Sequence, residues 1–196
     1  MNNRFTENIT KEDIQALPLQ AFEGEINVIE TEEDCNEAVH ILNKESVIGF
    51  DTEAKPAFNK GEYNHTALVQ LSTLDEAFLF RLNKMGYPKS LFNLFENESI
   101  LKLGISITDD LKDLQKVRKF MPGSFVDMND VARDLGVVHM GVKKLAAIFL
   151  DARISKNQQV SNWENETLSP AQQKYAATDA WICLAIHDEL RKRGYA

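Results

Sequence analysis

The feature that most constrains this chain is a short apolar run that leads directly into two carboxylates. Residues 46–50 have the length and apolar content of a buried strand, and Asp51-Thr52-Glu53 follows at once. In an extended chain, residues i and i+2 point to one face, so these two carboxylates lie roughly 7 Å apart on the same side. Such a pair has two interpretations: a solvated strand end, or two ligands of one metal site.

The hydrophobic pattern of the rest of the chain predicts a mixed α/β architecture. Strand-like segments cover residues 25–29, 46–50, 67–72, 77–82 and 100–105. Helical spacing covers a segment opened by Thr31, residues 90–97, a segment capped by Thr108, and residues 127–135, 142–150 and 170–193, with Gly194 as the final stop. Strands that precede alternating helices predict one α/β domain over residues 25–196, with residues 1–24 as an N-terminal extension.

Composition narrows the classes of partner. The 196 residues carry 30 acidic and 22 basic side chains, a formal charge of −8, which argues against a basic protein that wraps nucleic acid. A carboxylate site filled with divalent metal can still bind phosphates, because the metal inverts the local charge. Cys35 and Cys183 are far apart in sequence and predict core residues rather than a disulfide or zinc site. Without a signal-peptide core or a membrane-length apolar run, we expect a cytoplasmic protein with no membrane contact and infer no stable protein partner.

Two further segments place acids where they could join the first pair. Asp109 and Asp110 follow the strand-like residues 100–105 at a helix start, where the helix dipole alone would also favour them. Tyr175 and Asp179 are four residues apart and share one helix face. The alternative for that pair is a core tyrosine beside an exposed aspartate.

Taken in order, the three segments resemble the motifs of the DnaQ-like 3′–5′ exonucleases of the DEDD superfamily. The first motif corresponds to residues 50–53, the second to residues 102–114, and the third to residues 175–180 with the upstream stretches 161–163 and 168–172. Tyr175 places the chain in the tyrosine-bearing branch that includes ribonuclease D, because the histidine-bearing branch has histidine where Lys174 stands here. The resemblance covers roughly residues 25–193 and implies a ribonuclease H-like mixed β-sheet flanked by helices.

The resemblance also implies a catalytic site. In the second motif the acid lies six residues after Gly104 and four before Leu114, which selects Asp110, with Asp109 as the alternative. Two divalent metal ions, Mg²⁺ or Mn²⁺, would then be held by four carboxylates, while a tyrosine orients the attacking water. The implied metal ligands are Asp51, Glu53, Asp110 and Asp179, and the implied orienting residue is Tyr175.

The implied activity is hydrolysis of phosphodiester bonds at the 3′ end of single-stranded DNA or RNA, which releases nucleoside monophosphates. Candidate substrate contacts are Lys55, Phe58 and Lys60 after the first motif, and Lys156 and Trp163 before the third. The alternatives are solvated lysines and a tryptophan that braces the last helix. Two other functions remain compatible with these motifs: an inactive nucleic-acid or protein-binding module on the same fold, and an endonuclease of the ribonuclease H type.

Overall fold

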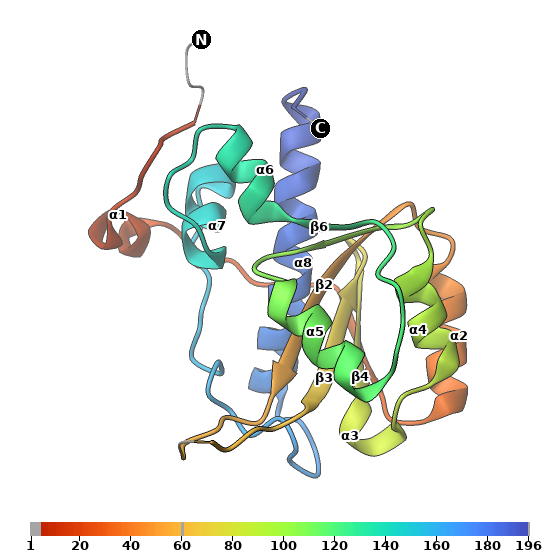
Figure 1. The fold of residues 1–196 in the computed structure, drawn as a ribbon. Coiled ribbons are helices and arrows are strands. Elements are labelled where there is room, and N and C mark those ends of the chain that lie inside the picture. The colour runs from red at the N-terminus through yellow and green to blue at the C-terminus, as the bar shows by residue number, and fades with distance from the viewer. Residues whose placement is uncertain (1–4, 60, 196) are drawn as a thin grey trace.

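The central element of the fold is a six-stranded mixed sheet in the order β1-β4-β3-β2-β5-β6 (Figure 1). The computed structural model describes residues 5–59 and 61–195. The pairs β2/β3 and β3/β4 are antiparallel, whereas β1/β4, β2/β5 and β5/β6 are parallel. The strands are β1 (Glu25–Ile29), β2 (Val47–Ala54), β3 (Thr66–Ser72), β4 (Glu76–Arg81), β5 (Leu101–Gly104) and β6 (Phe125–Asp127).

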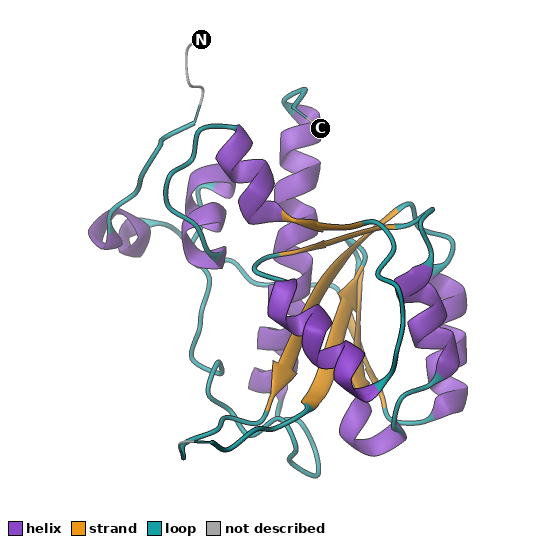
Figure 2. Cartoon of the chain, viewed as in Figure 1, coloured by secondary structure: helices purple, strands orange, loops and turns teal. Residues whose placement is uncertain are grey.

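Helices cover both faces of this sheet (Figure 2). One face packs against α2 (Glu32–Leu42), α4 (Lys89–Glu96) and α5 (Thr108–Val117), and the other against α6 (Met128–Asp134), α7 (Val142–Leu150) and α8 (Pro170–Lys192). The short helices α1 (Lys11–Ala16) and α3 (Leu82–Met85) complete the described set. The predicted mixed α/β fold is confirmed. No helix in the described part of the chain is both long and apolar enough to span a bilayer.

Alternation along β2 separates two cores and sets the position of the acids. Ile48 and Phe50 point into the cluster formed with α2 and α4. Gly49 and Asp51 point to the opposite face, because side chains alternate along a strand. A Cβ on Gly49 would lie 2.1 Å from the carbonyl oxygen of Ala180 in α8. The helix backbone therefore rests directly on β2 at a point where no side chain intervenes.

The long helix α8 begins and ends as its sequence predicts. Ser169 caps it: its hydroxyl accepts a hydrogen bond from the backbone N–H of Gln172, and the Gln172 side-chain oxygen accepts one from the backbone N–H of Ser169. Pro170 occupies the first turn. Gly194 follows the helix with φ +78°, the left-handed conformation that glycine adopts without strain. The ends of α8 are thus defined locally, while its register against the sheet is set by packing.

The segment before β1 is attached to this helix. The backbone N–H of Phe22 donates to Thr178 Oγ1 at 3.0 Å, and the Phe22 ring is buried. Backbone hydrogen bonds also join residues 18–20 to Arg153. The N-terminal segment therefore helps to hold α8 and the loop that precedes it.

Several elements differ from the sequence-based expectations. β2 extends to Ala54, so the acids lie within the strand rather than beyond its end. Residues 125–127 form a sixth strand that the pattern did not predict, because three half-buried residues show no measurable alternation. Thr108 is the first residue of α5 and Ile107 takes the cap position without a side-chain hydrogen bond.

Candidate active site

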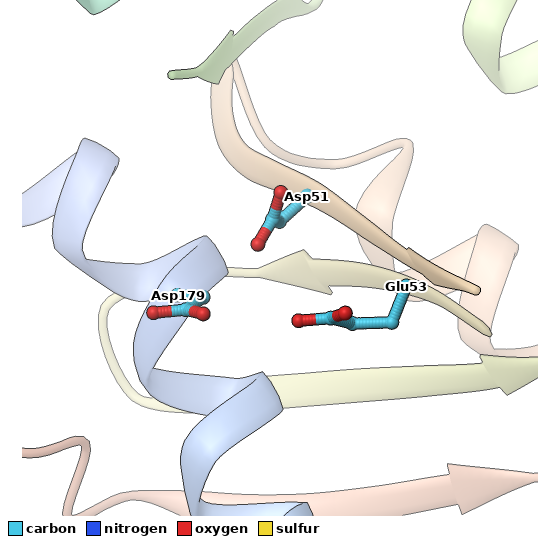
Figure 3. Close-up of side chains that lie close together, drawn as sticks. All are labelled: Asp51, Glu53 and Asp179. Atoms are coloured by element: carbon cyan, nitrogen blue, oxygen red, sulfur yellow. The ribbon is translucent and has the colours of Figure 1, made fainter. Parts of the chain in front are cut away.

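Strand β2 presents two carboxylates on the face that α8 covers. Asp51 and Glu53 alternate with Thr52, and both are half-buried. Figure 3 shows their carboxylates turned toward each other and toward Asp179. The extended backbone through Glu53 places the two acids at the i, i+2 spacing that the sequence predicted.

Helix α8 brings the third carboxylate. Asp179 precedes Ala180, whose carbonyl oxygen contacts β2 at Gly49, and the small side chains of Ala176 and Ala177 keep the helix close to the sheet. The Asp179 side chain is only 3% exposed. The contact at Gly49 therefore determines the separation between the carboxylates of β2 and that of α8.

These three acids form a cluster whose oxygens can be chosen to lie within 4.8 Å of one another. Burial, followed by the charges of Asp179, Glu53 and Asp110, raises the pKa of Asp51 well above its usual range. Burial and the charge of Asp179 raise the pKa of Glu53 to about 8. Burial likewise raises the pKa of Asp179. The cluster is thus costly to ionise without a compensating cation.

Asp110 lies beside this cluster rather than inside it. Its carboxylate accepts a hydrogen bond from Oγ1 of Thr52, the residue between Asp51 and Glu53 on β2. Burial raises the pKa of Asp110, and its charge contributes to the raised pKa values of Asp51 and Glu53. Asp110 reaches β2 because β5 pairs only with residues 47–49, which leaves the rest of that strand edge accessible to α5.

The neighbouring Asp109 has a different environment. Its side chain is 88% exposed and pairs with Lys112 at 2.8 Å, one turn along α5. The hydrogen bond and charge of Lys112 lower the pKa of Asp109. The geometry therefore favours Asp110 as the second-motif acid, as the Gly104 spacing indicates.

Lys156 supplies positive charge to the cluster. Its Nζ lies 2.7 Å from Asp179 Oδ2 and 4.7 Å from the centre of the Tyr175 ring, and its side chain is 14% exposed. Its positive charge lowers the pKa values of Asp51, Glu53 and Asp179 and so offsets part of the increase caused by burial. The predicted substrate contact at Lys156 therefore involves a residue that is already paired with a candidate metal ligand.

Tyr175 is buried one helical turn before Asp179, as their spacing predicts. Burial, followed by the charges of Asp179 and Glu53, raises the pKa of the phenol above its usual value, so it stays protonated at neutral pH. Its hydroxyl makes no short hydrogen bond among the described residues, and the Asp179 carboxylate is its neighbouring acceptor. It remains available to interact with a group that enters the site.

The structure corrects the expectation that Trp163 stacks on a nucleotide base. The indole is fully buried, packs with Leu68 and Leu79, and lies 5.8 Å from the Tyr175 ring between ring centres. A base has no exposed indole face to stack on in this arrangement. Trp163 instead braces Tyr175 and the start of α8, the alternative raised by its sequence position.

The remaining candidate contacts lie on the loop between β2 and β3. Phe58 is 81% exposed, which leaves its ring free to stack, and Lys55 pairs at 3.9 Å with Glu164 from the loop before α8. That ion pair places the two loops side by side at the lower edge of the sheet in Figure 1. Lys60 lies outside the described residues.

A cavity of about 240 Å³ opens beside the carboxylates. Asp51, Asp179 and Lys156 form part of its wall, and Ser106, Gln159 and Val142 are among the other lining residues. The motifs did not indicate these three as site residues, because Ser106 lies within the second motif without being one of its acids, and Gln159 and Val142 lie outside all three motifs. The cavity gives a small group access to two of the acids.

The residues of the cluster fit a hard divalent cation. Every candidate ligand is a carboxylate, the donor type that suits Mg²⁺ or Mn²⁺, whereas a zinc site would favour cysteine or histidine. Asp179 Oδ1 is buried and makes no short hydrogen bond among the described residues, and the Tyr175 hydroxyl is a neighbouring donor to this carboxylate. Three mutually repelling acids, one with a buried oxygen that makes no short hydrogen bond, are the arrangement that a bound cation would stabilise.

Comparison with known proteins agrees with this geometry. The family model described as 3′-5′ exonuclease matches residues 26–194. The chain belongs to the 3′-5′ exonuclease family. The resemblance stated from the three motifs is therefore confirmed, and the family includes hydrolases of nucleic acid.

Individual relatives of this exonuclease domain are much longer proteins. The bifunctional 3′-5′ exonuclease/ATP-dependent helicase WRN of Mus musculus is 31% identical over 188 residues, covering 91% of this chain and 13% of WRN. The chain spans 28% of the exonuclease mut-7 homologue of Aedes aegypti. These sequence matches thus concern one region of each relative.

Solved structures support the fold. The Aedes aegypti Nibbler EXO domain superposes with a TM-score of 0.81 at 22% identity, covering 89% of this chain and 92% of that one. Escherichia coli RNase D superposes with a TM-score of 0.76 at 20% identity, covering 87% and 46%. The exonuclease domain described here therefore has a ribonuclease D-like fold.

Proposed function

We propose that this exonuclease domain removes nucleoside monophosphates from the 3′ end of single-stranded DNA or RNA by hydrolysis that depends on two divalent cations. The observation that carries the proposal is the convergence of Asp51, Glu53 and Asp179, with Asp110 beside them, next to a cavity that reaches Asp51 and Asp179. An inactive binding module would retain the same repulsion between buried acids without gaining catalysis from it.

The four acids have distinct positions toward the cations. Asp51, Glu53 and Asp179 would hold them directly, since their oxygens already converge. Asp110 would contribute from its position beside Thr52. When bound, Mg²⁺ or Mn²⁺ ions would supply an acidified water and positive charge for the non-bridging phosphate oxygens. The chain itself positions the four carboxylates, and these carboxylates must lose their protons before they can bind a cation.

Tyr175 orients water rather than removing its proton. Its raised pKa keeps the hydroxyl protonated, so it can donate one hydrogen bond and accept another, but it is a poor base. The Trp163 ring and the Lys156 ammonium both lie against the Tyr175 ring and restrict it. This restriction holds the hydroxyl close to Asp179 and Glu53, whose charges contribute to its raised pKa.

Substrate would approach along the two loops at the lower edge of the sheet. Phe58 offers an exposed ring for a base, and Lys55 offers an ammonium that is only loosely paired. Because these contacts are few and the chain is acidic overall, we expect weak strand binding with a shallow salt dependence.

Digestion of 5′-labelled single-stranded DNA and RNA in Mn²⁺, Mg²⁺ or EDTA tests the proposal. We expect a ladder that shortens from the 3′ end in the presence of either cation, and no cleavage in EDTA. Asp51→Asn removes a central carboxylate charge and should abolish hydrolysis. Asp134→Asn makes the same change at an exposed aspartate at the end of α6, outside the site, and serves as the matched control with parental activity.

Circular single strands separate this function from that of an endonuclease, because an exonuclease needs a free end. Cleavage of circles would favour the ribonuclease H-type alternative. Full metal-dependent hydrolysis by Asp51→Asn would refute the assignment of the site. Binding without hydrolysis by the parent protein, with either cation present, would favour the inactive binding module.

A further inference from the structure

Gln70 lies in the centre of β3, directly opposite Asp51 in the antiparallel β2/β3 ladder. Residues that face each other across a ladder project to the same side of the sheet, with Cβ atoms about 5 Å apart. That side carries α8: Gly49, opposite Ser72, contacts the helix backbone, and Leu68 packs against Tyr175 and Ala176. Gln70 is therefore enclosed between the sheet and α8 beside Asp51.

The Gln70 amide is unusual for so enclosed a position. The side chain is 0% exposed, and neither Nε2 nor Oε1 has a hydrogen-bond partner among the described residues. A buried polar group without partners costs free energy, whereas an apolar side chain of similar shape would not. An amide at this position is therefore unfavourable for stability as the site stands.

The chemistry next to Gln70 supplies a partner for that amide. On the same face of β3, the residues next to Gln70 are Leu68 and Ser72, and nearby residues of α8 include alanines. Asp51 is the charged residue directly across the ladder from Gln70. An ionised carboxylate only accepts hydrogen bonds, and an amide N–H is a donor. Donation from Gln70 would leave the other Asp51 oxygen free for the cluster.

We propose that Gln70 is a positioning residue for Asp51, donating its amide N–H to the Asp51 carboxylate when the cluster holds its cations. The inference rests on the proposed function and adds a role that no motif contains. Gln70 acts through Asp51 and does not touch the substrate. Its amide thereby contributes to metal affinity and to turnover at the expense of the stability of the metal-free domain.

Gln70→Met, a near-isosteric apolar change, tests this role in the whole chain, and Ser72→Ala is the matched control. Ser72 Oγ is equally buried and unpartnered on the same face of β3, but it lies opposite Gly49. Calorimetric titration with Mn²⁺ alone should show binding weakened roughly tenfold to hundredfold in Gln70→Met, the range for a hydrogen bond to a charged group. Ser72→Ala should bind Mn²⁺ like the parent.

Thermal unfolding in EDTA separates positioning from a structural role. We expect Gln70→Met to melt at or above the parental temperature, while its kcat falls and its KM is unchanged. Parental Mn²⁺ affinity in Gln70→Met, or a lowered melting temperature with unchanged affinity, would overturn the inference while leaving the exonuclease function intact. Failure of the parent to bind Mn²⁺ would overturn both.

A measurement on the parent keeps the inference testable if Gln70→Met does not fold. In ¹H–¹⁵N spectra, the side-chain amide of Gln70 is assigned by specific labelling or by its loss in Gln70→Leu. Adding Mg²⁺ should move one of its protons downfield and slow its exchange with water, as expected for a new hydrogen bond to a carboxylate. An amide signal unchanged by saturating Mg²⁺ contradicts the proposed contact.

Discussion

Replacement of Lys156 by methionine is expected to tighten metal binding by this domain. The Lys156 ammonium lies 2.7 Å from Asp179 Oδ2, and both side chains are largely buried. A divalent cation that uses Asp179 must therefore face this ammonium or displace it. Methionine retains most of the apolar stem but removes the charge, so the entering cation no longer competes with it.

Coulomb's law gives the scale of the competition. At an effective dielectric constant of about 20, two ionised carboxylates whose oxygens lie within 4.8 Å repel by at least about 3.5 kcal/mol. The Lys156–Asp179 pair at 2.7 Å attracts by about 6 kcal/mol on the same scale. One ammonium thus offsets only part of the repulsion among three acids, which agrees with the raised pKa of Glu53. Releasing Lys156 costs about 1.5–3 kcal/mol after solvation, as for a hydrogen bond to a charged group, so affinity should rise roughly tenfold to hundredfold.

Calorimetric titration of Mn²⁺ into the parent and Lys156→Met measures this change without substrate. Lys55→Met is the matched control, because Lys55 is exposed and its loss changes the net charge equally. In EDTA, Lys156→Met should melt at least about 5 °C below the parent, since an uncompensated carboxylate remains buried, and saturating Mn²⁺ should narrow that difference. Equal or weaker Mn²⁺ binding by Lys156→Met, with Lys55→Met unchanged, would refute the reasoning.

Three further outcomes follow from the site. Because the pKa of Glu53 rises from 4.5 to about 8 on folding, the metal-free fold binds more protons than the unfolded chain in that interval. The melting temperature in EDTA should therefore fall as the pH rises through this interval, and saturating Mn²⁺ should reduce this dependence on pH. A melting temperature in EDTA that instead increases with pH would contradict the raised pKa of Glu53. Tyr175→Phe should lower kcat about tenfold to hundredfold with parental Mn²⁺ affinity, measured by single-turnover digestion and calorimetry. Asp110→Asn should lower kcat/KM by about a hundredfold or more, whereas Asp109→Asn should stay near the parental value in the same assay; the reverse order would exchange their roles.

Much of the fold could be predicted from local signals. The strand over residues 25–29 and the helix over residues 142–150 have the bounds that their hydrophobic patterns predict. The capping residues around α8 define both of its ends. These features depend on neighbours in sequence. The strand over residues 125–127 depends on pairing with β5, which no pattern within three residues can reveal.

In the candidate site, too, some features depend on neighbours in sequence and others depend on packing between distant segments. The i, i+2 spacing of Asp51 and Glu53 and the i, i+4 spacing of Tyr175 and Asp179 are local, so the sequence could place each pair on one face. Burial of Trp163 depends on packing against distant strands, and the expectation of substrate contact there was wrong.

The positions of Lys156 and Gln70 relative to the acids could not be predicted from the spacing of residues in the sequence. The ion pair of Lys156 with Asp179 depends on the path of a long loop between α7 and α8. Gln70 did carry a signal, since it interrupts an otherwise apolar strand segment. Only the β2/β3 register shows that it faces Asp51.

Because Gly49 contacts Ala180, binding of a cation at the site is expected to affect the stability of the whole domain. A cation shared by Asp51 and Asp179 would bridge the middle of the sheet and a 23-residue helix that also anchors the segment around Phe22. At a hundred times its dissociation constant, such a cation adds about 2.7 kcal/mol to the free energy of unfolding. Amides along α8 should consequently exchange with deuterium more slowly as divalent ions become plentiful, which makes the supply of these ions a determinant of how long the folded protein survives.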